Sequence, residues 1–400
     1  MIGTSTGGLI AIMLGRLRMP VNQAKEQYER LGNYIFGSPK TFHYRSLRFA
    51  RRCKFSATRL AFAVNDVAKK NSGLVNIGLD QIVAFHSDNT GICKTLVVAH
   101  AELDASLQKG GNVNLPYIFR PYSLDAPAAG ATSAPGMPCN PGPACNLSIR
   151  DVARATTAAP TYFKPLLIPV DTRNQRFKDG GMQANNPTEE GQSEVNYRHN
   201  NHHLDFIVSV GTCAHRSPLL FKNRRDDGGL RDLLNDIWGA VRGMTNTYPV
   251  HERVSNHFQT YKLSYYRFDD DTSEGWKGIK MDDWRSGLEN GEYKAGSRTL
   301  QTIRDLVREF VRCKSDNLKE CARKLVKRRR LRMLDNHRWE RYALAQTISS
   351  PHGDCVDLRP FIQRDRFNAH NSTYHTGDEQ VGRGQSWYYA RDEEGGVSGD

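Results

Sequence analysis

Several features are absent from the 400-residue sequence, and each absence excludes a class of protein to which the chain could belong. No apolar run approaches the roughly 20 residues that a membrane-spanning helix needs. The eight cysteines form no C-x-x-C pair, and the thirteen histidines show no metal-binding spacing. Cysteines spread singly through a long chain are typical of reduced thiols. We therefore expect a cytoplasmic protein that needs neither a metal nor another cofactor.

The sequence does contain enough apolar residues to form a substantial hydrophobic core. Hydrophobic residues make up 38% and charged residues 25%, which allows one large domain or two smaller ones. Helical periodicity occurs at Val21 to Phe36 and at Ser56 to Lys70, where Ser56 is a candidate N-cap. Strands are predicted at Thr95 to His100, Pro116 to Tyr122, Leu166 to Val170 and Leu204 to Val210.

This alternation of helices with short apolar strands predicts an α/β layered fold with a central, mostly parallel sheet flanked by helices. A Pro-, Ala- and Gly-rich stretch from Asp125 to Asn146 is predicted to be a long loop. Ser148 begins a capped helix after it, and Gly229 to Met244 is amphipathic. Thr260 to Phe268 alternates like an edge strand.

The first residues carry a G-x-S-x-G motif, composed of Gly3, Thr4, Ser5, Thr6 and Gly7. Small residues on both sides of a serine permit a strained turn from strand to helix that exposes the hydroxyl. The apolar helix that follows is expected to end at Pro20. Because only two residues precede Gly3, we expect the preceding strand to be missing and the sequence to be incomplete. The simpler interpretation is a glycine-rich turn with Ser5 or Thr6 as the helix N-cap.

A second block runs from Ala153 to Pro165 with the sequence A-R-A-T-T-A-A-P-T-Y-F-K-P, and Asp179-Gly180-Gly181 follows it. Together with the serine motif, this block resembles the patatin-like phospholipase family. The stretches from Cys93 to Ala99 and from Ile207 to Thr212 also match the family's pattern. The resemblance extends from residue 1 to about residue 215 and more loosely to about residue 300.

The resemblance implies a lipid acyl hydrolase that cleaves ester bonds of glycerolipids or phospholipids. Ser5 would be the nucleophile and Asp179 its base, in a Ser-Asp dyad that forms an acyl-serine intermediate. The residues themselves leave a second arrangement open, in which His202, His203 or His215 is the base of an α/β-hydrolase triad. An isolated Asp-Gly pair is otherwise most often a simple turn.

The family also has a glycine-rich G-G-G-x-R-G loop that donates backbone N–H groups to the oxyanion, and this sequence contains no such segment. The backbone N–H of Thr6 is the remaining candidate donor. We therefore expect low activity from this chain alone. The alternative is a catalytically impaired patatin-like protein that acts as a lipid-binding or interaction module.

The C-terminal region is predicted to be helical and basic. Between residues 312 and 341, twelve Lys or Arg stand against four Asp or Glu. The basic cluster has its centre at Lys327, Arg328, Arg329, Arg330 and Arg332. A run of this kind is most often a solvated helix, but it also fits contact with an anionic membrane, or a nuclear-localisation or nucleic-acid patch.

No nucleic-acid-binding fold motif accompanies this cluster, so we expect no nucleic-acid partner and favour a membrane-peripheral role. We predict a catalytic domain at residues 1–300, a basic helical region at 301–345 and a polar tail at 346–400.

Overall fold

The computed structural model describes residues 1–37, 53–72, 81–87, 93–102, 116–125, 138–170, 173–199, 204, 206–213, 247–270, 274–276, 279 and 282–334. The chain divides into two units, Met1–Asn317 and Leu318–Asp400. The predicted helix at 229–244 and the predicted tail at 346–400 lie outside the described residues. The predicted domain boundaries at residues 300 and 345 stay predictions.

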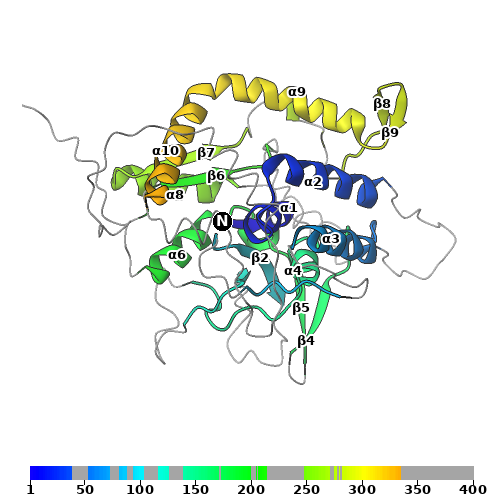
Figure 1. Ribbon diagram of the computed structural model, residues 1–400, viewed down its shortest axis with the longest axis horizontal. Helices are drawn as coiled ribbons and strands as arrows, with labels where there is room; N and C mark the ends of the chain where they lie inside the picture. Colours follow the sequence, from blue (N-terminus) through cyan, green and yellow to red (C-terminus); the bar gives the residue numbers. More distant parts are fainter. Residues whose placement is uncertain are drawn as a thin grey trace, which may run out of the picture. The chain divides into compact units, whose positions relative to one another are not determined.

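Strand β2 (Leu96–Glu102) is the centre of the main sheet, and its residues are buried almost throughout. It pairs in parallel with β1 (Ile2–Thr4) and antiparallel with β3 (Pro116–Phe119) and β5 (Arg173–Asp179). Strand β4 (Leu166–Val170) pairs antiparallel with β5. Figure 1 shows β2 among these strands and the helices beside it.

The prediction of a mostly parallel sheet is wrong for the described strands. In the main sheet only β1 and β2 run parallel, and the other pairings are antiparallel. Strands β4 and β5 run antiparallel because only two residues connect them, and a connection that short can close only a hairpin. A separate pair, β6 (Phe206–Val210) and β7 (Ser264–Phe268), is parallel, and β8 (Gly287–Glu289) forms a hairpin with β9 (Glu292–Lys294).

Helices account for most of the remaining described residues. Helix α1 continues as a π-helical turn, η1, that ends before Pro20. The predicted caps are confirmed, because Ser56 accepts a hydrogen bond from Arg59 N and Ser148 accepts one from Asp151 N. The bounds are α1 (Thr6–Ala11), η1 (Ile12–Arg16), α2 (Val21–Phe36), α3 (Ala57–Asn71), α4 (Ile149–Thr156), α5 (Gly181–Ala184), α6 (Thr188–Arg198), α8 (Tyr248–Thr260), η3 (Glu274–Trp276), α9 (Ser297–Cys313) and α10 (Ser315–Met333).

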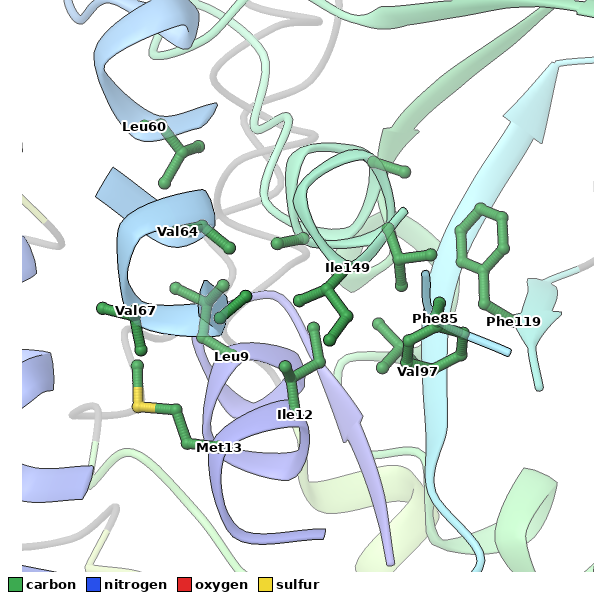
Figure 2. Packing of buried hydrophobic residues seen from close by; sticks show 14 of the residues in the cluster. Leu9, Ile12, Met13, Leu60, Val64, Val67, Phe85, Val97, Phe119 and Ile149 are labelled. Atoms are coloured by element: carbon green, nitrogen blue, oxygen red, sulfur yellow. The ribbon is translucent and has the colours of Figure 1, made fainter. Parts of the chain in front are cut away.

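The larger hydrophobic core lies where α1 and α4 pack on one face of β2 and α3 packs against α4. Figure 2 shows Leu9 of α1, Val64 of α3 and Ile149 of α4 turned toward each other, with Val97 of β2 beside them. Burying each such side chain stabilises the fold by about 1.5 to 3 kcal/mol. This packing fixes α1 on the sheet, and with α1 it fixes Ser5, the residue in front of the helix.

Within the described part of the chain, no helix has the length and apolar character needed to cross a membrane.

Candidate active site

The site is formed where two strands end against the same edge of β2. The register pairs Thr4 of β1 with Val98, and Asp179 of β5 with Ala99. Strand β3 pairs with this part of β2 as well, so it must occupy the opposite edge. Because β1 runs parallel and β5 antiparallel to β2, their last residues meet at adjacent positions. Ser5 and Asp179 are therefore neighbours although 174 positions separate them.

Ser5 and Asp179, the two predicted site residues, are in direct contact. The Ser5 Oγ donates a hydrogen bond of 2.7 Å to Asp179 Oδ2. The backbone N–H of Gly181 donates to the other carboxylate oxygen, Oδ1, at 2.8 Å. Each oxygen of the carboxylate thus accepts one of these hydrogen bonds, and the Ser5 hydroxyl donates to a carboxylate oxygen.

Ser5 lies in a strained turn between β1 and α1, with φ 55° and ψ −123°. The expectation that no strand precedes the serine is wrong, because Ile2–Thr4 form a short strand held by β2. Gly3 is required in this turn, since a Cβ there would lie 2.1 Å from the carbonyl oxygen of Gly7. A Cβ at Gly7 would meet nothing within 4 Å, so only the first glycine of the motif has a steric role.

The carboxyl group of Asp179 is completely buried. Burial raises its pKa to about 7, while the hydrogen bonds from Ser5 and Gly181 oppose that rise because they favour the charged form. A carboxylate with a pKa near neutrality can both accept and release a proton at physiological pH. This is the behaviour required of a general base.

The remaining motif residues surround this pair. Thr4 is buried and its Oγ1 donates to the Ala184 carbonyl oxygen at 2.7 Å. Thr6 begins α1, where backbone N–H groups have no acceptor within the helix. A Cβ at Gly180 would lie 2.4 Å from the Val98 carbonyl oxygen, so glycine allows β5 to end this close to β2. The assignment of the Thr6 N–H as an oxyanion donor stays a prediction.

Thr156 is a site residue that sequence reasoning did not single out. Its Oγ1 accepts a hydrogen bond from the Ser5 N–H at 2.8 Å, and the residue is fully buried. It belongs to the alanine- and threonine-rich block that carried the family resemblance. That block was the available signal, but it does not reveal which of two adjacent threonines reaches the serine.

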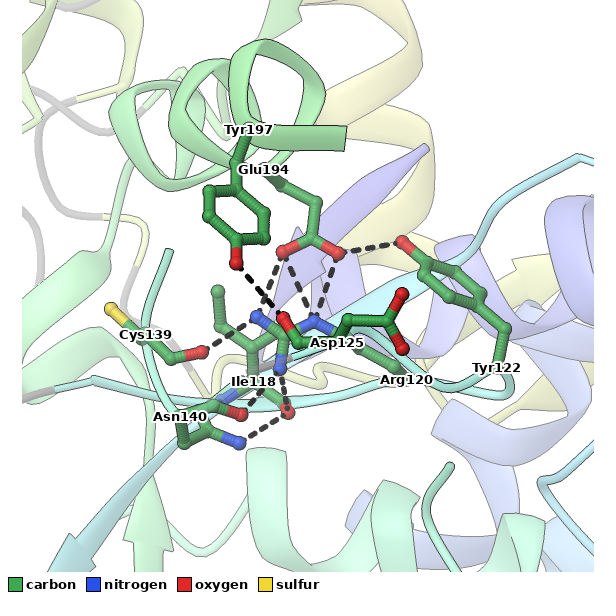
Figure 3. Close-up of polar contacts among 8 residues, drawn as sticks. All are labelled: Ile118, Arg120, Tyr122, Asp125, Cys139, Asn140, Glu194 and Tyr197. Atoms are coloured by element: carbon green, nitrogen blue, oxygen red, sulfur yellow. Dashed lines mark hydrogen bonds and ion pairs between the residues drawn. The ribbon is translucent and has the colours of Figure 1, made fainter. Parts of the chain in front are cut away.

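Sequence reasoning also missed a buried ion pair. Figure 3 shows Arg120, just after β3, with its guanidinium on the carboxylate of Glu194 from α6. The Tyr122 hydroxyl donates to Glu194 Oε1 at 2.8 Å, and Arg120 also donates to the carbonyl oxygens of Cys139 and Asn140. These bonds attach α6 and the segment around residue 140 to the sheet. Individual polar residues in a sequence give no sign of such a pairing.

The alternative base residues, His202, His203 and His215, lie outside the described residues. The residues of the basic cluster lie on α10, where Lys327, Arg329 and Arg330 are exposed and Arg328 is half-buried. Among the described residues, no group of three or more His, Cys, Asp or Glu side chains is arranged to hold a metal ion.

The comparison with known families agrees with the site. Residues 1–191, which include both Ser5 and Asp179, match the sequence model described as patatin-like phospholipase. This part of the chain is a patatin-like phospholipase domain. The predicted family is thereby confirmed, and with it the α/β class of the fold.

The proteins of similar sequence are named as phospholipases. The chain is similar to the calcium-independent phospholipase A2-gamma of Oryctolagus cuniculus, at 22% identity over 249 residues, which is 62% of this chain and 27% of that protein. The Homo sapiens protein of the same name gives the same identity and coverage. Phospholipase A I of Arabidopsis thaliana is 25% identical over 233 residues, covering 52% of this chain and 18% of the relative. The chain thus spans about a quarter or less of these relatives' length.

Proposed function

We propose that this chain is a serine lipid acyl hydrolase that cleaves ester bonds of glycerolipids or phospholipids. The observation that carries the proposal is the 2.7 Å hydrogen bond from Ser5 Oγ to the buried carboxylate of Asp179, made at a serine with positive φ. The family match and the phospholipase names of the relatives support a lipid ester as substrate.

In the proposed reaction, Asp179 takes the hydroxyl proton as Ser5 Oγ attacks the acyl carbonyl carbon. The tetrahedral intermediate collapses, the leaving alcohol receives the proton from Asp179, and the acyl group stays on Ser5. Water then attacks the acyl-serine with Asp179 again as base, which releases a fatty acid and restores the hydroxyl.

The oxyanion of the intermediate needs hydrogen-bond donors. The Thr6 N–H at the start of α1 is the donor that we propose, since helix N-termini stabilise negative charge. Removing one such donor in other enzymes slows turnover by about 10²- to 10³-fold.

The test is covalent labelling of the 400-residue chain with a fluorophosphonate probe, together with hydrolysis of a fluorogenic phospholipid. Labelling should occur at Ser5 and disappear in Ser5→Ala, and Asp179→Asn should lower hydrolysis by at least about 10⁴-fold. The matched control is Asp66→Asn, which removes an exposed carboxylate paired with Lys70 and should leave both measurements unchanged.

Two results would contradict the proposal. Labelling that persists in Ser5→Ala would mean that another residue is the nucleophile. A folded wild-type chain that is neither labelled nor active would favour the lipid-binding module instead.

We further propose that the basic cluster on α10 contacts anionic lipid headgroups and keeps the enzyme at a cytoplasmic membrane surface. The support is the local density of positive charge, with five Lys or Arg among the six residues from Lys327 to Arg332. Each basic residue near an anionic surface contributes about 1 kcal/mol to binding.

A further inference from the structure

Thr156 lies at the last turn of α4, and its hydroxyl connects the nucleophile to the sheet. The Thr156 Oγ1 accepts from the Ser5 N–H at 2.8 Å and donates to the Val98 carbonyl oxygen at 2.5 Å. Since an N–H only donates and a carbonyl only accepts, the direction of both hydrogen bonds is fixed. One fully buried hydroxyl therefore links the backbone of Ser5 to the central strand.

Ser5 needs such a link because its backbone conformation is unfavourable. A φ of 55° with ψ of −123° is costly for any residue other than glycine, and it persists only where the surroundings enforce it. Three bonds do so here. The Ser5 N–H donates to Thr156 Oγ1, the Ser5 carbonyl oxygen accepts from Leu9 N at 3.2 Å, and the Ser5 hydroxyl donates to Asp179.

Thr156 also contacts both sides of the Ser5 and Asp179 pair. Its carbonyl oxygen accepts from the N–H of Gly180, the residue after Asp179, at 3.4 Å. Its side chain packs on α1 so closely that a Cβ at Gly8 would lie 3.0 Å from both Oγ1 and the methyl carbon. A shift of Thr156 would thus move the nucleophile relative to its base.

We propose that Thr156 is a positioning residue that holds Ser5 in the conformation from which its Oγ attacks. This inference rests on the proposed function and assigns a role to a residue that does not itself contact the reacting atoms. One consequence is that the Ser5 N–H is already bonded to Thr156, which leaves the oxyanion to later N–H groups of α1, beginning with Thr6.

The test compares Thr156→Val with Thr156→Ser and with Thr157→Val. Valine keeps the shape of threonine but removes the hydroxyl, whereas serine keeps the hydroxyl. Thr157 is the matched control, because it is also buried and its Oγ1 donates only to its own helix, at the Ala153 carbonyl oxygen 2.7 Å away. We expect Thr156→Val to lower kcat by about 10²-fold with KM unchanged, because displacements of about 1 Å cost that much.

Thr156→Ser should recover kcat to within about threefold of wild type, and Thr157→Val should retain wild-type kcat and fluorophosphonate labelling. Equal losses of kcat in Thr156→Val and Thr157→Val would overturn the inference, since they would point to general loosening of α4. Full kcat in Thr156→Val would overturn it as well.

A crystal structure of each variant separates this inference from the proposed function. If the wild-type chain neither labels nor hydrolyses lipid, the proposed function fails, but the conformation of Ser5 still decides the role of Thr156. The expected result in Thr156→Val is a Ser5 φ that leaves the positive region and an Oγ that loses Asp179 Oδ2. A Ser5 that keeps φ near 55° and its bond to Asp179 would refute the positioning role.

Discussion

At the scale of the residue, Asp179 combines complete burial with one hydrogen-bond donor on each carboxylate oxygen. Burial disfavours the charged form and raises the pKa to about 7. In the proposed reaction the ionised form of Asp179 is the base, and its population rises as pH increases through 7. Below that pH the carboxyl holds a proton and cannot accept one from Ser5.

The raised pKa of Asp179 predicts how lipid hydrolysis depends on pH. We expect kcat/KM to fall about tenfold per pH unit below about pH 7 and to level off above it, because one deprotonation is required. The measurement is the pH profile of kcat/KM between pH 5 and 9. Asp66→Asn should leave the profile in place, since Asp66 is a partly exposed residue in a surface ion pair. A flat profile between pH 5 and 8 would exclude Asp179 as the base.

At the scale of the element, the turn from β1 into α1 depends on one glycine more than on the other. Gly3 lies where any Cβ would clash with the Gly7 carbonyl oxygen, whereas a Cβ at Gly7 has open space around it. Gly7 is in the first turn of α1, and in a helix alanine is favoured over glycine by about 0.5 to 1 kcal/mol.

We therefore predict opposite outcomes for two identical substitutions. Gly3→Ala should remove fluorophosphonate labelling and lower the thermal midpoint of unfolding, because the 2.1 Å overlap forces the turn open. Gly7→Ala should leave the midpoint unchanged or slightly higher and retain labelling. Thermal unfolding and labelling of the two variants, side by side, check this. Loss of labelling in Gly7→Ala with the fold intact would show that the second glycine has a role in the reaction itself.

Local sequence predicted several of the individual elements but not how they pair, and it did not indicate α6 or α8. The N-caps at Ser56 and Ser148 were correct because capping depends on residues within one helical turn. The predicted strand from Thr260 begins at Ser264, since Thr260 ends α8. Strand direction was missed because an apolar run has the same pattern in parallel and antiparallel sheets. Only the connections and the register determine which occurs.

At the scale of the whole molecule, more than half of the formal net positive charge arises in one stretch, residues 312–341. The formal net charge is +13, and residues 312–341 carry twelve of the basic residues against four acidic ones. The basic cluster falls in the second of the two units, Leu318–Asp400. Attraction to a charged membrane depends on such local density and weakens as salt screens it.

We predict that the chain floats with liposomes containing phosphatidylserine and not with neutral liposomes. Replacing Lys327, Arg328, Arg329, Arg330 and Arg332 by Gln should abolish flotation, since five contacts of about 1 kcal/mol each are lost. The matched control removes five exposed basic residues from other helices, Lys25, Arg30, Arg59, Arg298 and Arg308, and should keep flotation. Equal losses in both variants, or binding indifferent to phosphatidylserine, would refute a specific role of the basic cluster.

The sequence by itself determined the family, the candidate pair Ser5 and Asp179, and the two helices capped by Ser56 and Ser148, because motifs and caps are local patterns of residue type. The tertiary structure decided what joins distant parts of the chain. It brought the ends of β1 and β5 together on one edge of β2, and it set the hydroxyl of Thr156, rather than that of Thr157, against the Ser5 N–H. It also paired Arg120 with Glu194. These contacts depend on strand register and helix rotation, which packing of the whole core fixes and no short stretch of sequence encodes.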